Sequence, residues 1–166
     1  MRNDQSDPKE AAAKFLAHLR QLRDDRGAMA DLRCALNPAR RARAWPLLAR
    51  VGGIDRPIYE TVAGLFAHHP EETHTGNIGT TCCRLAAKYS SFDGRFRRLL
   101  SCDREETAER LRPVILAAKA KGIPVNYEEL FSDLWYWGDK VKARWAREYW
   151  AAPAEAETAA TTEVAS

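Results

Sequence analysis

The stretch LFSDLWYWGDKVKARWAREYW, residues 130–150, decides the fold class of this chain. Its apolar residues recur every three or four positions, a spacing that puts them on one face of a helix. Gly138 separates two such faces, and Asn126 with Glu129 precedes the first of them in the order of a helix-capping pair. The stretch therefore predicts two consecutive amphipathic helices. Their core-facing positions are Tyr127, Leu130, Phe131, Leu134 and Trp135, then Val141, Trp145 and Tyr149.

The same helical period continues toward the N-terminus, and no segment alternates with the period of a strand over more than a few residues. Asp7 followed by Pro8 predicts the start of a first helix, and Lys121–Gly122 predicts the end of a later one. The chain has 166 residues, of which 45% are hydrophobic and only 9 are glycine. We therefore expect an all-α fold of about eight to nine helices in two small packed subdomains.

Composition along the chain predicts how it is organised. Residues 1–7 are polar and are expected to be a flexible N-terminus, followed by a helical domain over 8–150. Its subdomains are expected at about 8–90 and 91–150. Residues 151–166 are mostly Ala, Thr and Glu and predict a disordered acidic tail. The sequence shows neither a membrane span nor a signal peptide, and four cysteines without a C-x-x-C pair suit a reducing cytoplasm.

Catalytic and metal-binding motifs are missing from the sequence. Cys82 and Cys83 are adjacent, a spacing that suits two ligands of one zinc ion poorly. His69 and His74 flank a predicted loop, where histidines are more often solvated than metal-bound. The motifs of serine hydrolases, P-loop enzymes, zinc proteases and dinucleotide-binding enzymes are absent. We expect no catalytic residue, no metal and no cofactor.

Positive charge is unevenly distributed. The net charge is +3, but residues 33–50, 84–98 and 140–150 carry +5, +4 and +3, with neutral or negative segments around them. Most of the basic residues are arginine, whose planar guanidinium binds phosphate oxygens bidentately. Clustered arginine favours nucleic-acid binding, and solvated helix faces are the alternative. The candidate nucleic-acid contacts are Arg33, Arg40, Arg41, Arg43, Arg50, Arg84, Lys88, Arg95, Arg97, Arg98, Lys140, Lys142, Arg144 and Arg147.

Three blocks of the sequence resemble one protein family in order and spacing. They are residues 130–150, residues 44–50 (AWPLLAR) and residues 94–106 (GRFRRLLSCDREE). Together they resemble the CasB family, the small subunits of the type I-E CRISPR surveillance complex Cascade. The resemblance covers roughly residues 10–150.

This resemblance implies a helical protein of two subdomains without catalytic activity, two copies of which lie head to tail in the complex. It implies as partners the large and backbone subunits of Cascade, the CRISPR RNA and the target DNA with its displaced strand. The implied role is to hold the R-loop open by supporting the guide–target heteroduplex and binding the displaced strand. Many of the candidate basic residues lie inside the three blocks, but the resemblance assigns no particular strand to any of them.

Three other functions remain open from the sequence. In the first, the protein is an assembly subunit whose basic faces contact acidic protein surfaces. In the second, it is an independent helical DNA-binding regulator, although no recognition-helix motif is evident. A hydrolase is the third and least supported, since nothing in the sequence marks a nucleophile.

Overall fold

The computed structural model describes the backbone of residues 7–164 and the side chains of residues 7–151. This part of the chain contains nine α-helices and four short 3-10 helices, and its one β-bridge joins Glu72 to Val125. The all-α prediction is confirmed. The α-helices are α1 (Pro8–Leu22), α2 (Arg26–Arg33), α3 (Trp45–Leu48), α4 (Pro57–His68), α5 (Ile78–Ala86), α6 (Phe92–Leu100), α7 (Thr107–Lys121), α8 (Tyr127–Trp135) and α9 (Asp139–Val164). The 3-10 helices are η1 (Cys34–Leu36), η2 (Arg41–Ala44), η3 (Ala49–Val51) and η4 (Arg104–Glu106).

Local sequence explains where these helices begin and end. The Asp7 carboxylate accepts a hydrogen bond from the Lys9 backbone N–H at 3.2 Å, with Pro8 in the first turn of α1. Asn126 caps α8 in the same way, since its side chain accepts from the Glu129 N–H at 3.2 Å. Helix α7 ends at Gly122, whose φ of 64° is in the left-handed region that glycine adopts without strain.

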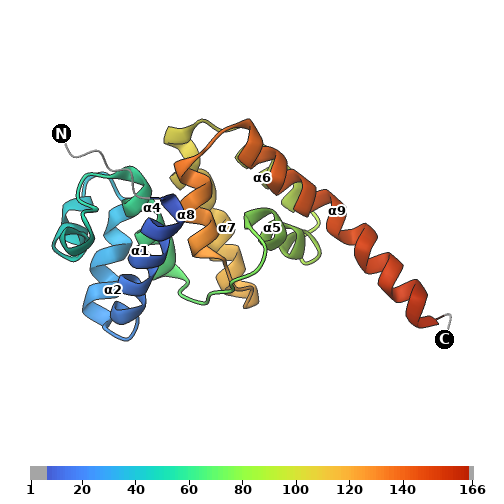
Figure 1. The fold of residues 1–166 in the computed structure, drawn as a ribbon, viewed down its shortest axis with the longest axis horizontal. Helices are drawn as coiled ribbons and strands as arrows, with labels where there is room; N and C mark the ends of the chain where they lie inside the picture. The colour runs from blue at the N-terminus through green and yellow to red at the C-terminus, as the bar shows by residue number, and fades with distance from the viewer. Residues whose placement is uncertain (1–6, 165–166) are drawn as a thin grey trace.

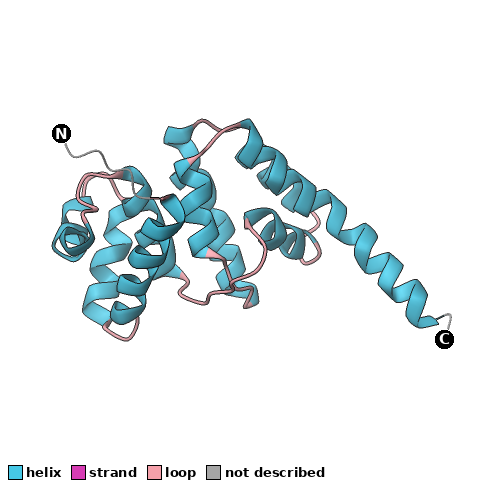
Figure 2. Cartoon of the chain, in the orientation of Figure 1, coloured by secondary structure: helices cyan, strands magenta, loops and turns pink. Residues whose placement is uncertain are grey.

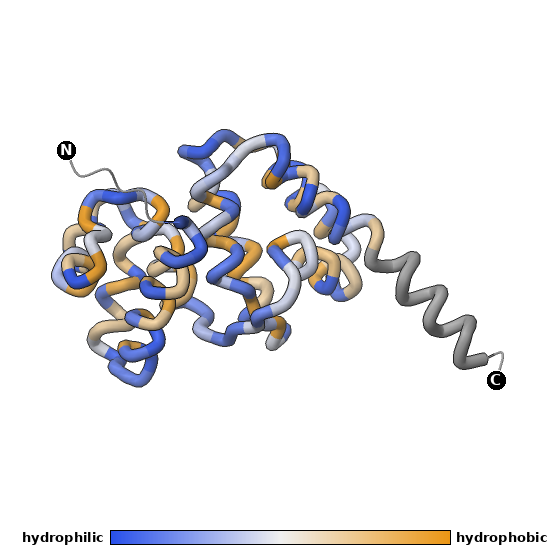
Figure 3. The backbone as a smooth tube through the Cα atoms, viewed as in Figure 1, coloured by the Kyte–Doolittle hydropathy of each residue, from blue (hydrophilic) through white to orange (hydrophobic). Residues whose placement is uncertain are grey.

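The helices form two neighbouring groups (Figures 1 and 2). Helices α1, α2, α4 and α8 pack together in one group, and α5, α6, α7 and α9 pack in the other. Helix α7 also contacts α4 and so joins the two groups. The buried apolar side chains form one continuous cluster across both, while polar segments follow the outside (Figure 3).

The packing crosses the expected subdomain boundary near residue 90. Helix α8 lies late in the sequence but packs against α1, and α5 lies before the boundary but packs against α9. The division into subdomains at that point stays a prediction. Residues 1–6 of the expected flexible N-terminus lie outside the described residues. Helix α9 runs through most of the expected tail to Val164, and disorder of residues 151–166 also stays a prediction.

Two glycines allow helices to approach closely. A Cβ atom at Gly79 in α5 would overlap the backbone carbonyl group of Trp145 in α9. A Cβ at Gly64 in α4 would overlap the side chain of Leu36 in η1. The close packing of α5 on α9 and of η1 on α4 therefore requires glycine, which has no side chain, at these two positions. Among the described residues, no helix is long and apolar enough to cross a membrane.

Candidate nucleic-acid interface

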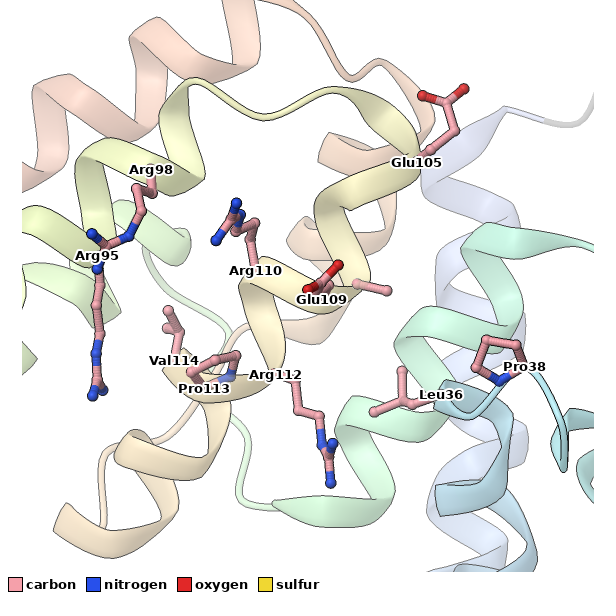
Figure 4. A pocket seen from close by; sticks show the side chains of 11 residues that line it. Leu36, Pro38, Arg95, Arg98, Glu105, Glu109, Arg110, Arg112, Pro113 and Val114 are labelled. Atoms are coloured by element: carbon pink, nitrogen blue, oxygen red, sulfur yellow. The ribbon is translucent and has the colours of Figure 1, made fainter.

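A cavity of about 710 Å³ opens between α6, α7 and the segment after η1. We call it the arginine groove. Four arginines line it: Arg95 and Arg98 from α6, and Arg110 and Arg112 from α7 (Figure 4). The other lining residues are Leu36, Pro38, Glu105, Ala108, Glu109, Pro113 and Val114. The groove therefore combines a basic side with an apolar one.

Helix periodicity turns these arginines outward. Phe92, Phe96 and Leu99 are buried on one face of α6, so Arg95 and Arg98 lie on the face that remains exposed. Leu111 and Val114 are buried in the same way on α7, which leaves Arg110 and Arg112 exposed.

The four guanidinium groups keep their donors for an external ligand. None of them forms an ion pair with a side chain of residues 7–151, where the structure describes side chains. Glu105 and Glu109 also line the groove, so its charge is positive but partly balanced. Four unpaired guanidinium groups along one depression are suited to a chain of phosphates, because guanidinium N–H groups donate strong charge-assisted hydrogen bonds to phosphate oxygens.

The basic surface extends from the groove toward α2. His68, at the end of α4, is half-buried, and its pKa lies below the usual value. Burial is the main cause, and the nearby positive charges of Arg112 and Arg33 add to it. The Arg33 side chain lies close to the end of the same helix, since its Nε donates to the Ala67 carbonyl oxygen at 3.2 Å while the residue stays exposed. Arg33 and Arg112 therefore belong to one positive region.

Four other candidate arginines are held in ion pairs within the chain. Arg41 contacts Asp55 at 2.7 Å and the buried carboxylate of Glu60 at 3.1 Å. The remaining pairs are Arg43–Asp31 at 3.2 Å, Arg97–Asp93 at 2.6 Å and Arg144–Asp133 at 3.1 Å. These pairs occupy donors that phosphate would otherwise use, and they give the four arginines a role in the fold.

The other candidate basic residues do not line the groove. Lys142 lies over the Trp137 ring, with its Nζ 5.4 Å from the ring centroid. The rest are exposed on several different elements, and they are Arg40, Arg50, Arg84, Lys88, Lys140 and Arg147. Of the 14 candidates, the groove brings together Arg95 and Arg98.

Arg110 and Arg112 were missed by the sequence analysis. They lie in the segment 99–139, whose net charge is −3, so a sum over the segment conceals them. The available signal was their position next to Leu111 and Val114. Those two residues form part of the apolar stripe of the helix, so Arg110 and Arg112 lie on its outer face.

Arg144 belongs to a buried polar network between α8 and α9. The Asp133 carboxylate is only 1% exposed, and it accepts hydrogen bonds from Trp145 Nε1 at 2.7 Å and Arg144 Nη2 at 3.1 Å. Burial raises the pKa of Asp133 above its ordinary value of 3.8, against the opposing effect of the two donors. The carboxylate therefore ties the two helices together at some electrostatic cost.

This network predicts a pH-dependent effect of Asp133→Asn. The raised pKa of Asp133 means that its charge destabilises the fold as pH rises above about 3.8. Asparagine keeps an oxygen to accept from Trp145 but carries no charge. We expect the urea midpoint of the variant, relative to that of the original protein, to increase between pH 4 and pH 7. A difference that stays the same at both pH values would contradict this account.

Burial disfavours the thiolate form of three of the four cysteines. Cys82 is fully buried, and burial raises the pKa of its thiol far above the ordinary value. Burial also raises the thiol pKa of Cys83 and of Cys102. Within the described residues, no three His, Cys, Asp or Glu side chains are grouped to hold a metal ion.

Solved structures share this arrangement of helices. CasB from Thermus thermophilus aligns with a TM-score of 0.70 and 28% identity, over 84% of this chain and 97% of that one. A second structure from Thermus thermophilus, a CRISPR-associated protein of the Cse2 family, aligns with a TM-score of 0.73 and 26% identity, over 84% and 97%. CasB from M. ruber, at 24% identity and a TM-score of 0.71 over 92% and 97%, shows likeness of fold.

Sequence comparison agrees with the structural one. The curated CRISPR-associated protein Cse2 of Thermus thermophilus is 31% identical over 107 residues. The match spans 62% of this chain and 62% of that relative, which is less than two thirds of its length. The profile of the family described as CRISPR-associated protein Cse2 matches residues 28–150. The chain therefore belongs to the Cse2 family, the family of the CasB proteins.

Proposed function

We propose that this protein is the non-catalytic small subunit of a type I-E Cascade complex and stabilises the R-loop by binding single-stranded DNA in the arginine groove. The observation that carries the proposal is the set of four exposed guanidinium groups, from α6 and α7, without an internal ion pair among the described side chains. Membership of the Cse2 family supports the CRISPR context.

The energetics of R-loops explain why such a subunit is useful. The RNA–DNA heteroduplex is about as stable as the DNA duplex that it replaces, so the exchange is nearly balanced. A protein that holds the released strand shifts this balance through phosphate contacts and counterion release. Contacts of this kind need no base-specific hydrogen bonds, so the subunit acts on any target sequence.

The proposed partners follow from this role. They are the large and backbone subunits of the complex, the CRISPR RNA, the target DNA with its displaced strand, and a second copy of this protein. Basic residues outside the groove are free to contact the guide–target heteroduplex from other faces of the molecule. Those with no ion pair to a described side chain are Arg40, Arg50, Arg84, Lys88, Lys140, Lys142 and Arg147.

An assembly-only subunit is the second candidate, and exposed apolar side chains favour it. Leu116 is 39% exposed beside a cavity that Tyr89 and Phe92 also line, and Tyr136 is 62% exposed. Such side chains suit contacts with other protein subunits.

Photocrosslinking in the assembled complex separates the two candidates. A p-benzoylphenylalanine placed at Glu109 lies in the groove, and one placed at exposed Gln21 on α1 is the matched control. With guide RNA and target DNA bound, we expect the Glu109 position to crosslink to the displaced strand and the Gln21 position not to. Crosslinks from Glu109 to protein subunits alone, in a complex that assembles normally, would favour the assembly-only function.

A further inference from the structure

The arginine groove continues into a second cavity of about 430 Å³. We call this second space the adjoining cavity. The two share four lining residues, so they form one depression across η1, η4 and the start of α7. The shared residues are Leu36, Pro38, Glu105 and Ala108. The adjoining cavity extends from there toward the start of α4 and the end of α8.

The chemistry of the depression changes along its length. The groove end carries four arginines that form no ion pair with a described side chain, whereas the adjoining cavity has a mainly apolar wall that includes Pro57, Ile58 and Leu134. The Glu60 carboxylate at the cavity is already engaged, because it accepts from Arg41 at 3.1 Å and from the Trp45 indole N–H at 3.3 Å.

We infer that the adjoining cavity is a nucleobase subsite, which takes one unstacked base of the single strand whose phosphates bind in the arginine groove. This inference rests on the proposed function and adds a base-binding site to it. A nucleotide has the same polarity as the depression, since its phosphate is anionic and its base is neutral with apolar faces. A volume of about 430 Å³ falls in the range of about 300–1,000 Å³ found for small-molecule sites.

Charge fixes the direction in which a nucleotide lies. The groove is lined by four arginines and two glutamates, whereas two arginines, Arg41 and Arg104, balance the two glutamates of the adjoining cavity, so the attraction for phosphate is stronger in the groove. The phosphate is therefore held at the arginine end. A base in a duplex stays stacked and paired, so only a single strand presents one to the cavity without the cost of unstacking a duplex.

Arg104 gives the adjoining cavity a guanidinium group in a fixed position. Its Nη1 donates to the Leu134 carbonyl oxygen at 2.6 Å, and its Nη2 donates to that of Trp135 at 3.3 Å. Carbonyl groups hold the side chain without neutralising it as a carboxylate would. A base beside a positioned guanidinium gains from cation–π attraction and stacking.

The wall of the site is formed before any ligand binds. Leu36 packs directly on the backbone of α4 at Gly64, where there is no room for a Cβ atom. A preformed wall avoids the loss of side-chain freedom that would otherwise weaken binding. The hydroxyl group of Thr107 donates to the Arg104 carbonyl oxygen at 2.8 Å, so its one donor is already used. We therefore expect the subsite to accept different bases.

A cavity-filling variant tests this inference with two DNA probes. Ala108→Phe fills the junction of the two cavities, and the full-length protein is titrated with labelled oligo(dT) and with an abasic strand of the same length. The original protein is expected to prefer oligo(dT). Ala108→Phe is expected to weaken oligo(dT) binding about fivefold or more, because base stacking contributes ~1–3 kcal/mol. Ile58→Ser removes apolar wall from the adjoining cavity and does not touch the groove, so it is expected to weaken oligo(dT) binding and to leave abasic-strand binding unchanged.

Arg98→Ala is the comparison variant. It removes a phosphate contact, so it should weaken the binding of both probes by the same factor. Equal binding of both probes by the original protein, with Arg98→Ala weakening both, would overturn the base subsite and leave the proposed function standing. Binding of neither probe would overturn both. Unchanged DNA binding by Ala108→Phe, together with its loss from the assembled complex, would assign the cavity to a protein side chain instead. Circular dichroism of each variant verifies that the helices have formed.

Discussion

Arg98→Glu combined with Arg112→Glu is expected to weaken the affinity for single-stranded DNA about 100-fold or more and to shorten the lifetime of the R-loop. Each reversal removes a charge-assisted hydrogen bond worth ~1.5–3 kcal/mol and introduces a charge that repels phosphate. The two residues lie on different helices, α6 and α7, on the sides of one groove. The measurements are the Kd for a labelled single strand and the dissociation rate of the displaced strand in the assembled complex.

The matched control is Arg23→Glu with Arg26→Glu, which makes the same change in net charge at exposed arginines outside the groove. Salt dependence gives a second readout. Loss of two phosphate contacts should reduce the slope of log K against log salt by about 1.4 in magnitude. Equal weakening by both pairs of substitutions would mean that only overall charge matters, and would contradict a binding site in the groove.

Gly79→Ala is expected to destabilise the fold by about 3 kcal/mol, near the upper end of the usual effect of overpacking. The added Cβ would overlap the backbone of Trp145, and backbone atoms within a helix cannot move aside as a side chain can. Helices α5 and α9 would have to separate along their contact. The free energy of unfolding from urea titration measures the effect.

Gly94→Ala provides the control for this substitution. Gly94 lies within α6, and a Cβ there would have no atom within 4 Å. Alanine restricts the unfolded chain more than glycine does, so this variant should gain about 0.5–1 kcal/mol. If Gly79→Ala also gained stability, the close contact of α5 with α9 would be incorrect.

The sequence predicted the helices well because their periodicity is a local property. Val141, Trp145 and Tyr149 were expected on the inner face of the last helix, and all three are buried. Local capping by Asp7 and Asn126 was predicted for the same reason. These features depend on residues within a few positions of one another, which a sequence displays directly.

Features that depend on distant residues could not be predicted. Nothing in the order of residues indicates that Arg41 meets Glu60 or that Arg144 meets the buried Asp133. The pairing of Arg97 with Asp93 is different, because these residues are four apart in one helix and their contact was foreseeable. The groove is nonlocal too, since its arginines share a surface only after α6 and α7 have packed.

The contact of α1 with α8 has a consequence for how the protein is made. About a hundred residues separate the end of α1 at Leu22 from the start of α8 at Tyr127. At ~5–20 residues per second, a ribosome needs about 5–20 s to synthesise that interval. During this time the apolar face of α1, which includes Phe15 and Leu19, lacks α8, its main packing partner. The first helix to emerge is thus among the last to be fully buried, and a newly made chain depends on its own late segment for protection against aggregation.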